Sequence, residues 1–225
     1  GGLCSLLAPR CIRLMSRRSL NRYQSKWPMV RPIECFLHRR MDGILANSLA
    51  VLAELQAEGV SDTTCGVIYN GVAEFPRREP KAVSALRAEF NVSSDAIVFV
   101  MVANLIPYKG HANLIAAFEI ARARLPQSWT LLLIGSDSGI ADCLQRQVVA
   151  AGLDTQIRWL GQRDDAQALL AIADIALLTS DEEGFSNVIL EAMAAGLPVI
   201  ATAVGGNVEA ILDGETGVIV PPGDV

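Results

Sequence analysis

This sequence of 225 residues lacks several patterns that would indicate a function directly. It contains no run of eighteen apolar residues, so it predicts no transmembrane helix. No Gly-x-Gly-x-x-Gly follows a candidate strand, which disfavours a nicotinamide-dinucleotide domain. The five cysteines and two histidines show no metal-ligand spacing, and no Asp-x-Asp follows a strand. We therefore expect no metal and no cofactor, and the scattered cysteines favour reduced thiols and a cytoplasmic location.

Aromatic residues are also scarce, at 5% of the chain, although the hydrophobic share reaches 51%. This aliphatic-rich composition is typical of α/β packing. From residue 96, apolar runs of strand length alternate with stretches of helix length, which predicts a doubly wound parallel sheet. The expected strands are 97–102, 130–134, 157–160, 175–178 and 197–201, and the expected helices are 109–123, 140–151, 166–172, 188–195 and a short one near 208.

The first third of the chain is interpreted as the C-terminal part of another Rossmann-like domain. Its expected strands are 11–15, 42–46 and 64–68, and its expected helices are 32–40 and 49–57, the second capped by Asn47 or Ser48. A polar linker region with one helix, 82–90, follows. We therefore predict an incomplete domain over 1–72 and a second domain over 73–225. Because the chain begins at Gly1 rather than Met and stops just after a strand, we expect truncation at both ends.

Positive charge is concentrated at the start of the chain. Residues 1–40 carry nine Lys and Arg and one acid, whereas residues 41–225 carry ten Lys and Arg and twenty-three acids. A basic segment on an acidic body predicts an anionic partner, such as a membrane surface or a phosphorylated acceptor, unless these arginines pair with acids of the body. Nucleic acid is disfavoured because the acidic body repels it. Arg17 and Arg18 follow an expected strand, so we expect them in a turn facing an anionic acceptor or a diphosphate, with plain surface exposure as the alternative.

The most informative stretch is 174–212. An apolar strand ends in an acidic loop with Glu183, Gly184 allows a turn, and a helix follows that Ser186 or Asn187 can cap. Glu191 lies eight residues after Glu183, about two helical turns on. Free N–H groups at the helix N-terminus between them favour a phosphate. Two carboxylates flanking a phosphate site fit a nucleotide sugar, whereas the alternative is a solvated loop acid and a surface glutamate.

The run EGFSNVILEAMAAGLPVIAT, followed by VGG-x-x-E, closely resembles the nucleotide-sugar site of retaining GT-B glycosyltransferases of the GT4-like family. The segment VIYNGV resembles the stretch that leads into the second domain of such enzymes. The resemblance implies that Glu183 holds the sugar hydroxyls and that Glu191 binds the ribose. It also implies a diphosphate site formed by Gly184 with the N–H groups near Phe185 and Ser186, and a backbone approach of Gly205 and Gly206 to the ligand. Glu209 is expected to be structural.

A second phosphate element follows the first strand of this domain. Lys109 stands where the next helix is expected to begin, a position that is unfavourable for a cation unless an anion is near. The resemblance implies that Lys109 contacts the diphosphate. Many relatives carry an arginine five residues earlier, where this chain has Asn104. Either Asn104 donates a hydrogen bond instead or another arginine compensates. The alternative for Lys109 is a surface lysine, and His38 and His111 are assigned no role.

Together these features predict a glycosyltransferase that moves a sugar from a nucleotide-sugar donor to an acceptor hydroxyl without a metal, and the resemblance implies that the anomeric configuration is retained. A glycan or lipid-linked acceptor of the cell envelope is expected, with peripheral contact between segment 1–40 and the inner face of the membrane. Two alternatives stay open. One is a sugar-nucleotide epimerase of the same fold, and the other is a fragment that binds a nucleotide sugar without transferring it.

Overall fold

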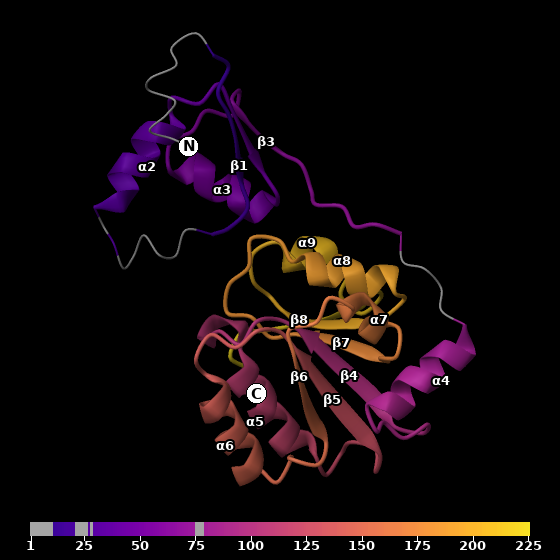
Figure 1. Ribbon diagram of the computed structural model, residues 1–225. Helices are drawn as coiled ribbons and strands as arrows, with labels where there is room; N and C mark the ends of the chain where they lie inside the picture. Colours follow the sequence, from indigo (N-terminus) through magenta and orange to yellow (C-terminus); the bar gives the residue numbers. More distant parts are fainter. Residues whose placement is uncertain (1–10, 21–26, 28, 75–78) are drawn as a thin grey trace.

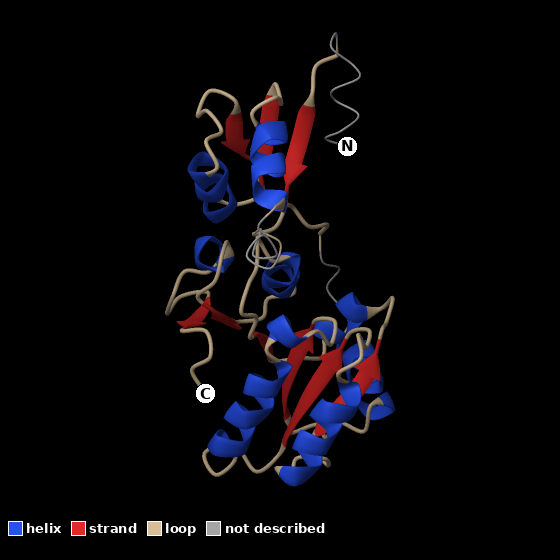
Figure 2. Ribbon diagram, turned by 90° about the vertical axis from the view of Figure 1, so that its left-hand side faces the viewer, coloured by secondary structure: helices blue, strands red, loops and turns tan. Residues whose placement is uncertain are grey.

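The computed structural model describes residues 11–20, 27, 29–74 and 79–225, which form two parallel sheets (Figure 1). The first sheet has the strand order β1-β2-β3, and the second has the order β6-β5-β4-β7-β8-β9. Helices cover both sides of the second sheet (Figure 2). The predicted Rossmann-like, doubly wound class is therefore confirmed.

The first sheet is built from short elements that occur in strict alternation. These are β1 (Leu14–Arg17), α2 (Val30–His38), β2 (Gly43–Ala46), α3 (Leu49–Ala57) and β3 (Cys65–Val67). Helix α3 has the predicted bounds, and Ser48 caps it because its Oγ accepts the N–H of Val51 at 3.1 Å. The connection from β3 to the second sheet contains the expected boundary at residue 72, and residues 75–78 of it lie outside the described part.

Strand β1 differs from its prediction. The expected strand 11–15 is shifted, so that Ser16 and Arg17 pair with Leu45 and Ala46 of β2 and do not form a turn. The apolar pattern could not reveal this, because Arg17 is a charged residue buried in the strand (6% exposed). Such burial requires charged partners, and α3 supplies them.

The second sheet has the predicted alternation of strands and helices. After α4 (Pro80–Glu89) come β4 (Ile97–Val102), the 3₁₀ turn η2 (Pro107–Lys109), α5 (His111–Ala121), β5 (Trp129–Ile134), α6 (Ala141–Ala150), β6 (Ile157–Gly161), α7 (Ala166–Leu170), β7 (Ile175–Leu178), α8 (Asn187–Ala194), β8 (Val199–Thr202), α9 (Asn207–Ala210) and β9 (Gly217–Val220). All six side chains of β5 are buried, as expected for a strand covered on both faces.

The helix expected over 109–123 is divided at its start. Gly110 has φ = +74°, and a Cβ there would lie 1.9 Å from the carbonyl oxygen of Thr179. The left-handed glycine therefore ends the 3₁₀ turn and lets the backbone pack against the end of β7. Helix α5 consequently begins at His111, and Lys109 is the last residue of the 3₁₀ turn before it.

Candidate functional site

The strand order places a crevice at the middle of the second sheet. From β4 the chain adds β5 and β6 on one side, and then returns to add β7, β8 and β9 on the other. The connection after β4 therefore leads toward β5, whereas the connection after β7 leads in the opposite direction, toward β8. This is the position where open α/β sheets bind ligands. Lys109 comes from the loop after β4, and Glu183 comes from the loop after β7.

These two charged residues meet directly. Lys109 Nζ lies 2.5 Å from Glu183 Oε1, and Ser180 Oγ donates to the same oxygen at 2.8 Å. Both side chains are mostly shielded, with 18% and 12% exposure for the lysine and the glutamate. The loops are also tied through their backbones, because the N–H of Asp181 donates to the carbonyl of Tyr108 at 2.7 Å. These contacts hold Lys109 and Glu183 in a fixed arrangement.

Residues of the first domain close one side of this site. A small cavity is lined by Arg18, Ser19, Leu20, Tyr108, Lys109, Glu182, Glu183 and Gly184. The backbone of Arg18 comes so close that a Cβ on Gly184 would lie 2.3 Å from the Arg18 carbonyl oxygen. The side chain of Arg18 reaches Asn70 Oδ1 at 3.3 Å, and Asn70 Nδ2 donates to Asn187 Oδ1 at 2.7 Å. Arg18 is thereby connected to the N-terminus of α8.

The two glycines after β8 pack against the Glu183 loop. A Cβ on Gly205 would lie 1.6 Å from the carbonyl oxygen of Glu183. The N–H of Gly206 donates to the carbonyl of Gly184 at 3.0 Å. The close backbone approach that the structure shows is therefore to the protein itself, and it fixes the loop that presents Glu183.

The start of α8 lies beside that loop. Ser186 is the N-cap residue, but its side chain makes no capping hydrogen bond, and it is buried. The ring of Phe185 is buried and lies 5.6 Å from the ring of Tyr69, centroid to centroid. The first N–H groups of α8 have no acceptor within the helix, which is the property that favours a phosphate.

Glu191 and Asn104 lie outside the cavity that Lys109 and Glu183 share. Glu191 is half-buried on α8, and burial raises the pKa of its carboxyl group. Asn104 is exposed, and its Oδ1 accepts the N–H of Ser136 at 3.1 Å, which joins the loops after β4 and β5. In the structure, Asn104 therefore links these two loops through a hydrogen bond.

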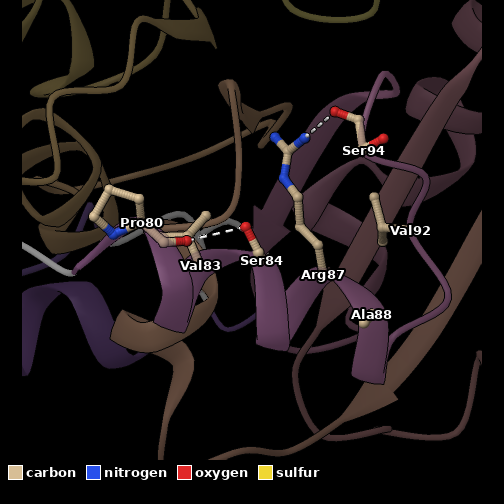
Figure 3. Close-up of a pocket in the computed structure, with 7 residues that line it drawn as sticks. All are labelled: Pro80, Val83, Ser84, Arg87, Ala88, Val92 and Ser94. Atoms are coloured by element: carbon tan, nitrogen blue, oxygen red, sulfur yellow. Dashed lines mark hydrogen bonds between the residues drawn. The ribbon is translucent and has the colours of Figure 1, made fainter.

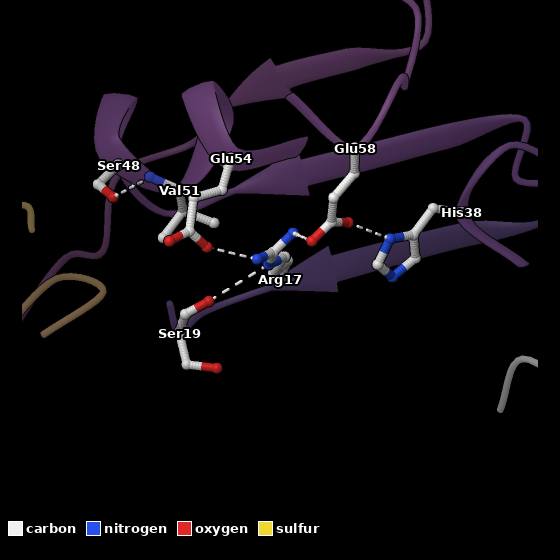
Figure 4. A network of polar contacts seen from close by, with 7 residues as sticks. All are labelled: Arg17, Ser19, His38, Ser48, Val51, Glu54 and Glu58. Carbon is white, nitrogen blue, oxygen red and sulfur yellow. Dashed lines mark hydrogen bonds and ion pairs between the residues drawn. The ribbon is translucent and has the colours of Figure 1, made fainter. Parts of the chain in front are cut away.

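Arg17 does not face the crevice. Its guanidinium donates to Glu54 at 2.5 Å and to Glu58 at 2.9 Å, and His38 Nδ1 lies 2.7 Å from the other Glu58 oxygen (Figure 4). The interpretation of Arg17 as an acceptor-side residue is corrected accordingly, because its charge is already engaged inside the first domain. Arg13 likewise pairs with Asp42 at 2.9 Å. Part of the basic segment therefore neutralises acids of the body, and residues 1–10, 21–26 and 28 of it lie outside the described part.

His111 is almost fully buried (1% exposed), and desolvation lowers its pKa to about 4. Its imidazole is neutral at pH 7, so we assign it a packing position at the start of α5. The residues that sequence reasoning missed are Ser180, which holds Glu183, and Asn70, which joins Arg18 to Asn187. Neither has a local sequence signal, because both act through contacts with distant loops.

Another pocket lies along α4 and is lined by Pro80, Val83, Ser84, Arg87, Ala88, Val92 and Ser94 (Figure 3). Arg87 is the charged residue there. Its guanidinium forms an ion pair with Asp174 at 3.0 Å and donates to the carbonyl of Ile172. None of the predicted site residues lines this pocket. Among the described residues, no group of three or more His, Cys, Asp or Glu side chains could hold a metal ion.

Comparison with known proteins identifies similar chains. A family model described as glycosyl transferases group 1 matches residues 83–225. The N-acetyl-alpha-D-glucosaminyl L-malate synthase of Bacillus anthracis is 33% identical over 159 residues, which cover 70% of this chain and 40% of that protein. The lipopolysaccharide core biosynthesis glycosyltransferase LpsE of Rhizobium meliloti is 30% identical over 221 residues, which cover 96% of this chain and 60% of that protein.

Solved structures with a fold similar to this chain include a further protein. The crystal structure of Anabaena HepE in complex with UDP and glucose covers 100% of this chain with a TM-score of 0.89 and 29% sequence identity. The same protein in complex with UDP-glucose gives the same TM-score of 0.89. The chain spans 61% of the HepE chain in the first of these structures. It therefore corresponds to roughly half of the proteins that it resembles.

Proposed function

The chain belongs to the family of glycosyl transferases group 1, and from this premise we propose that it moves a sugar from a nucleotide-sugar donor to an acceptor hydroxyl with retention of configuration. The ion pair between Lys109 and Glu183 carries the proposal. It lies at the crevice of the second sheet, beside the N-terminus of α8, where an anion is favoured. The neighbouring HepE structures contain UDP or UDP-glucose, so a uridine nucleotide is the first donor to test.

We propose that donor binding exchanges the partners of this pair. The diphosphate attracts Lys109 away from Glu183, and the N–H groups at the start of α8 bind the remaining phosphate oxygens. Glu183, still held by Ser180, is then free to accept hydrogen bonds from the sugar hydroxyls. Its negative charge also stabilises positive charge at the anomeric carbon. Glu191 is proposed to accept from the ribose hydroxyls.

In the reaction, the acceptor oxygen attacks the anomeric carbon from the face that the diphosphate leaves. The bond between that carbon and the phosphate oxygen breaks, and the proton of the acceptor hydroxyl passes to the departing diphosphate. Lys109 and the helix N–H groups stabilise the negative charge of the leaving group without a metal. Losing one preorganised interaction of this kind costs about 10²–10³ in rate.

The acceptor is proposed to be a glycan or lipid-linked molecule of the cell envelope. One relative in the family is a lipopolysaccharide core glycosyltransferase. Peripheral contact with a membrane is proposed for α2, and two observations support it. Ile33 and Phe36 of this helix are 57% and 50% exposed, and the guanidinium of Arg40, two residues after the helix, lies 4.4 Å from the centroid of the Phe36 ring. Apolar side chains beside arginines fit an anionic lipid surface. In the part of the chain that the structure describes, no helix is long and apolar enough to span a bilayer.

The proposal is tested by release of nucleoside diphosphate from UDP-, GDP- and ADP-sugars in the presence of EDTA. We expect one nucleotide sugar to be turned over, and Glu183→Gln to lose at least 10²-fold in rate while its melting temperature is kept. Analysis of the product by NMR gives the anomeric configuration. An interconverted sugar nucleotide would instead identify an epimerase. Binding without turnover would identify a non-catalytic module.

The membrane contact has its own test. We expect the protein to float with vesicles of phosphatidylglycerol and not with vesicles of phosphatidylcholine, and Phe36→Asp to abolish the flotation. Equal behaviour on both vesicles would contradict an electrostatic contact, and it would also remove the support for a location at the inner face of the membrane.

A further inference from the structure

Glu209 connects the two domains through its carboxylate. Its Oε2 accepts the N–H of Leu49 at 2.7 Å, and its Oε1 accepts the N–H of Ala50 at 3.0 Å. These N–H groups belong to the first turn of α3 in the first domain, so no acceptor within the helix is available to them. The negative charge of Glu209 also lies at the positive end of the helix dipole. Glu209 thus completes the N-terminus of a helix that precedes it by about 160 residues in sequence.

Several contacts around Glu209 join the same two surfaces. A Cβ on Gly206 would lie 2.9 Å from Ser48 Cβ, so the loop before α9 packs against the capping residue of α3. Burial and the neighbouring Glu209 carboxylate raise the pKa of Tyr69, and the ring of Tyr69 lies against Phe185. Figure 1 shows α8 and α9 on the side of the second domain that faces the first.

From this geometry we propose that Glu209 is a positioning residue, which holds the first domain against the Glu183 loop and so completes the cavity around Lys109. The effect on catalysis rests on the proposed function, whereas the contact between the domains does not. Glu209 does not line the cavity itself. It acts through a short sequence of contacts: the loop that leads into α9 binds Gly184 through Gly206, and Gly184 packs against the backbone of Arg18.

The physical consequence is a coupling between domain arrangement and catalysis. With Glu209 removed, two N–H groups of α3 lose their acceptor in the interface, and one of them is partly buried. Water can satisfy these groups once the domains separate, so the variant favours an open arrangement. In that arrangement Arg18, Ser19 and Leu20 move away from Glu183. Lys109 and the N-terminus of α8 both belong to the second domain, so donor affinity is retained while turnover falls.

The first test compares the wild-type chain with Glu209→Gln and Glu209→Ala by small-angle X-ray scattering. We expect a larger radius of gyration for Glu209→Ala and an intermediate value for Glu209→Gln, which keeps one acceptor oxygen but loses the charge. Glu215→Ala serves as the control, because Glu215 is an exposed glutamate of the same domain. An unchanged radius of gyration in both Glu209 variants, with the fold retained by circular dichroism, would overturn the proposal.

The second test measures donor turnover and donor affinity in the same variants. We expect Glu209→Ala to lower turnover at least tenfold, with the dissociation constant of the donor within about twofold of wild type. Equal loss of affinity and turnover would assign Glu209 to the donor site and contradict the positioning role. If the wild-type chain binds no nucleotide sugar, the proposed function fails, and the scattering experiment still decides whether Glu209 holds the domains together.

Discussion

Replacing Arg17 with methionine tests whether this residue is structural. Arg17 and Glu58 each have only 5% of their side-chain surface exposed, and they are joined at 2.9 Å (Figure 4). Removing the guanidinium leaves the Glu58 carboxylate buried, with His38 Nδ1 still 2.7 Å from its Oε2. Breaking one side of a buried ion pair typically costs 3–5 kcal/mol. Because His38 stays near Glu58, we expect a value near the lower end, about 3 kcal/mol.

The measurement is the free energy of unfolding from urea titrations followed by circular dichroism. Arg13→Met is the matched control, because Arg13 precedes the same strand and pairs with Asp42 at 2.9 Å, but with 28% and 44% side-chain exposure. Exposed pairs contribute about 0–1 kcal/mol. The double variant Arg17→Met/Glu58→Met removes both buried charges and should recover much of the loss. Equal losses of unfolding free energy in Arg17→Met and Arg13→Met would show that burial of the Arg17–Glu58 pair adds nothing to stability.

Three further predictions concern the second domain. Burial lowers the pKa of His111 to about 4, whereas its pKa in the unfolded chain is about 6.5, so His111 favours the folded state above pH 6.5 and this stability, about 3 kcal/mol, is lost as the pH falls to 4. His111→Asn should flatten this pH dependence in urea titrations at several pH values. Gly205→Ala should destabilise the protein strongly, because its Cβ would collide with the Glu183 carbonyl, whereas Gly214→Ala, with similar positive φ and open space, should cost much less in thermal melts. Glu191→Gln should raise the melting temperature of the unliganded protein, because burial disfavours the carboxylate, and should weaken donor binding about tenfold, or 1.4 kcal/mol, by titration calorimetry.

The regular elements could be predicted because their signals are local. Strands β4 and β7 have the predicted bounds, since each is an uninterrupted apolar run between polar segments. Helix α3 also has its predicted bounds, because Ser48 provides a capping signal that can be read from the sequence. The pairing of Lys109 with Glu183 was not predicted, although both residues were selected, because the sequence gives no distance between the loops after β4 and β7.

The remaining differences come from contacts between distant segments. The bounds of β1 were shifted because Arg17 is buried through Glu54 on α3 and Glu58 at the C-cap of that helix, 37 and 41 residues away. The role of Glu209 depends on α3, about 160 residues earlier. Glu191 lies eight residues after Glu183 in the sequence, but it does not line the cavity around Glu183. A spacing in sequence does not determine which side chains share a cavity. The bounds of β1, the role of Glu209 and the lining of the cavity all depend on tertiary contacts.

A diphosphate site at Lys109 can be tested by the melting temperatures of the wild-type chain and of Lys109→Met with UDP-, GDP- and ADP-sugars in EDTA. We predict that one nucleotide sugar stabilises the wild-type chain, by about 2.7 kcal/mol at a concentration 100 times the dissociation constant, and that Lys109→Met loses most of this shift. No shift with any nucleotide sugar, or an equal shift in Lys109→Met, would contradict a diphosphate site at the Lys109–Glu183 pair.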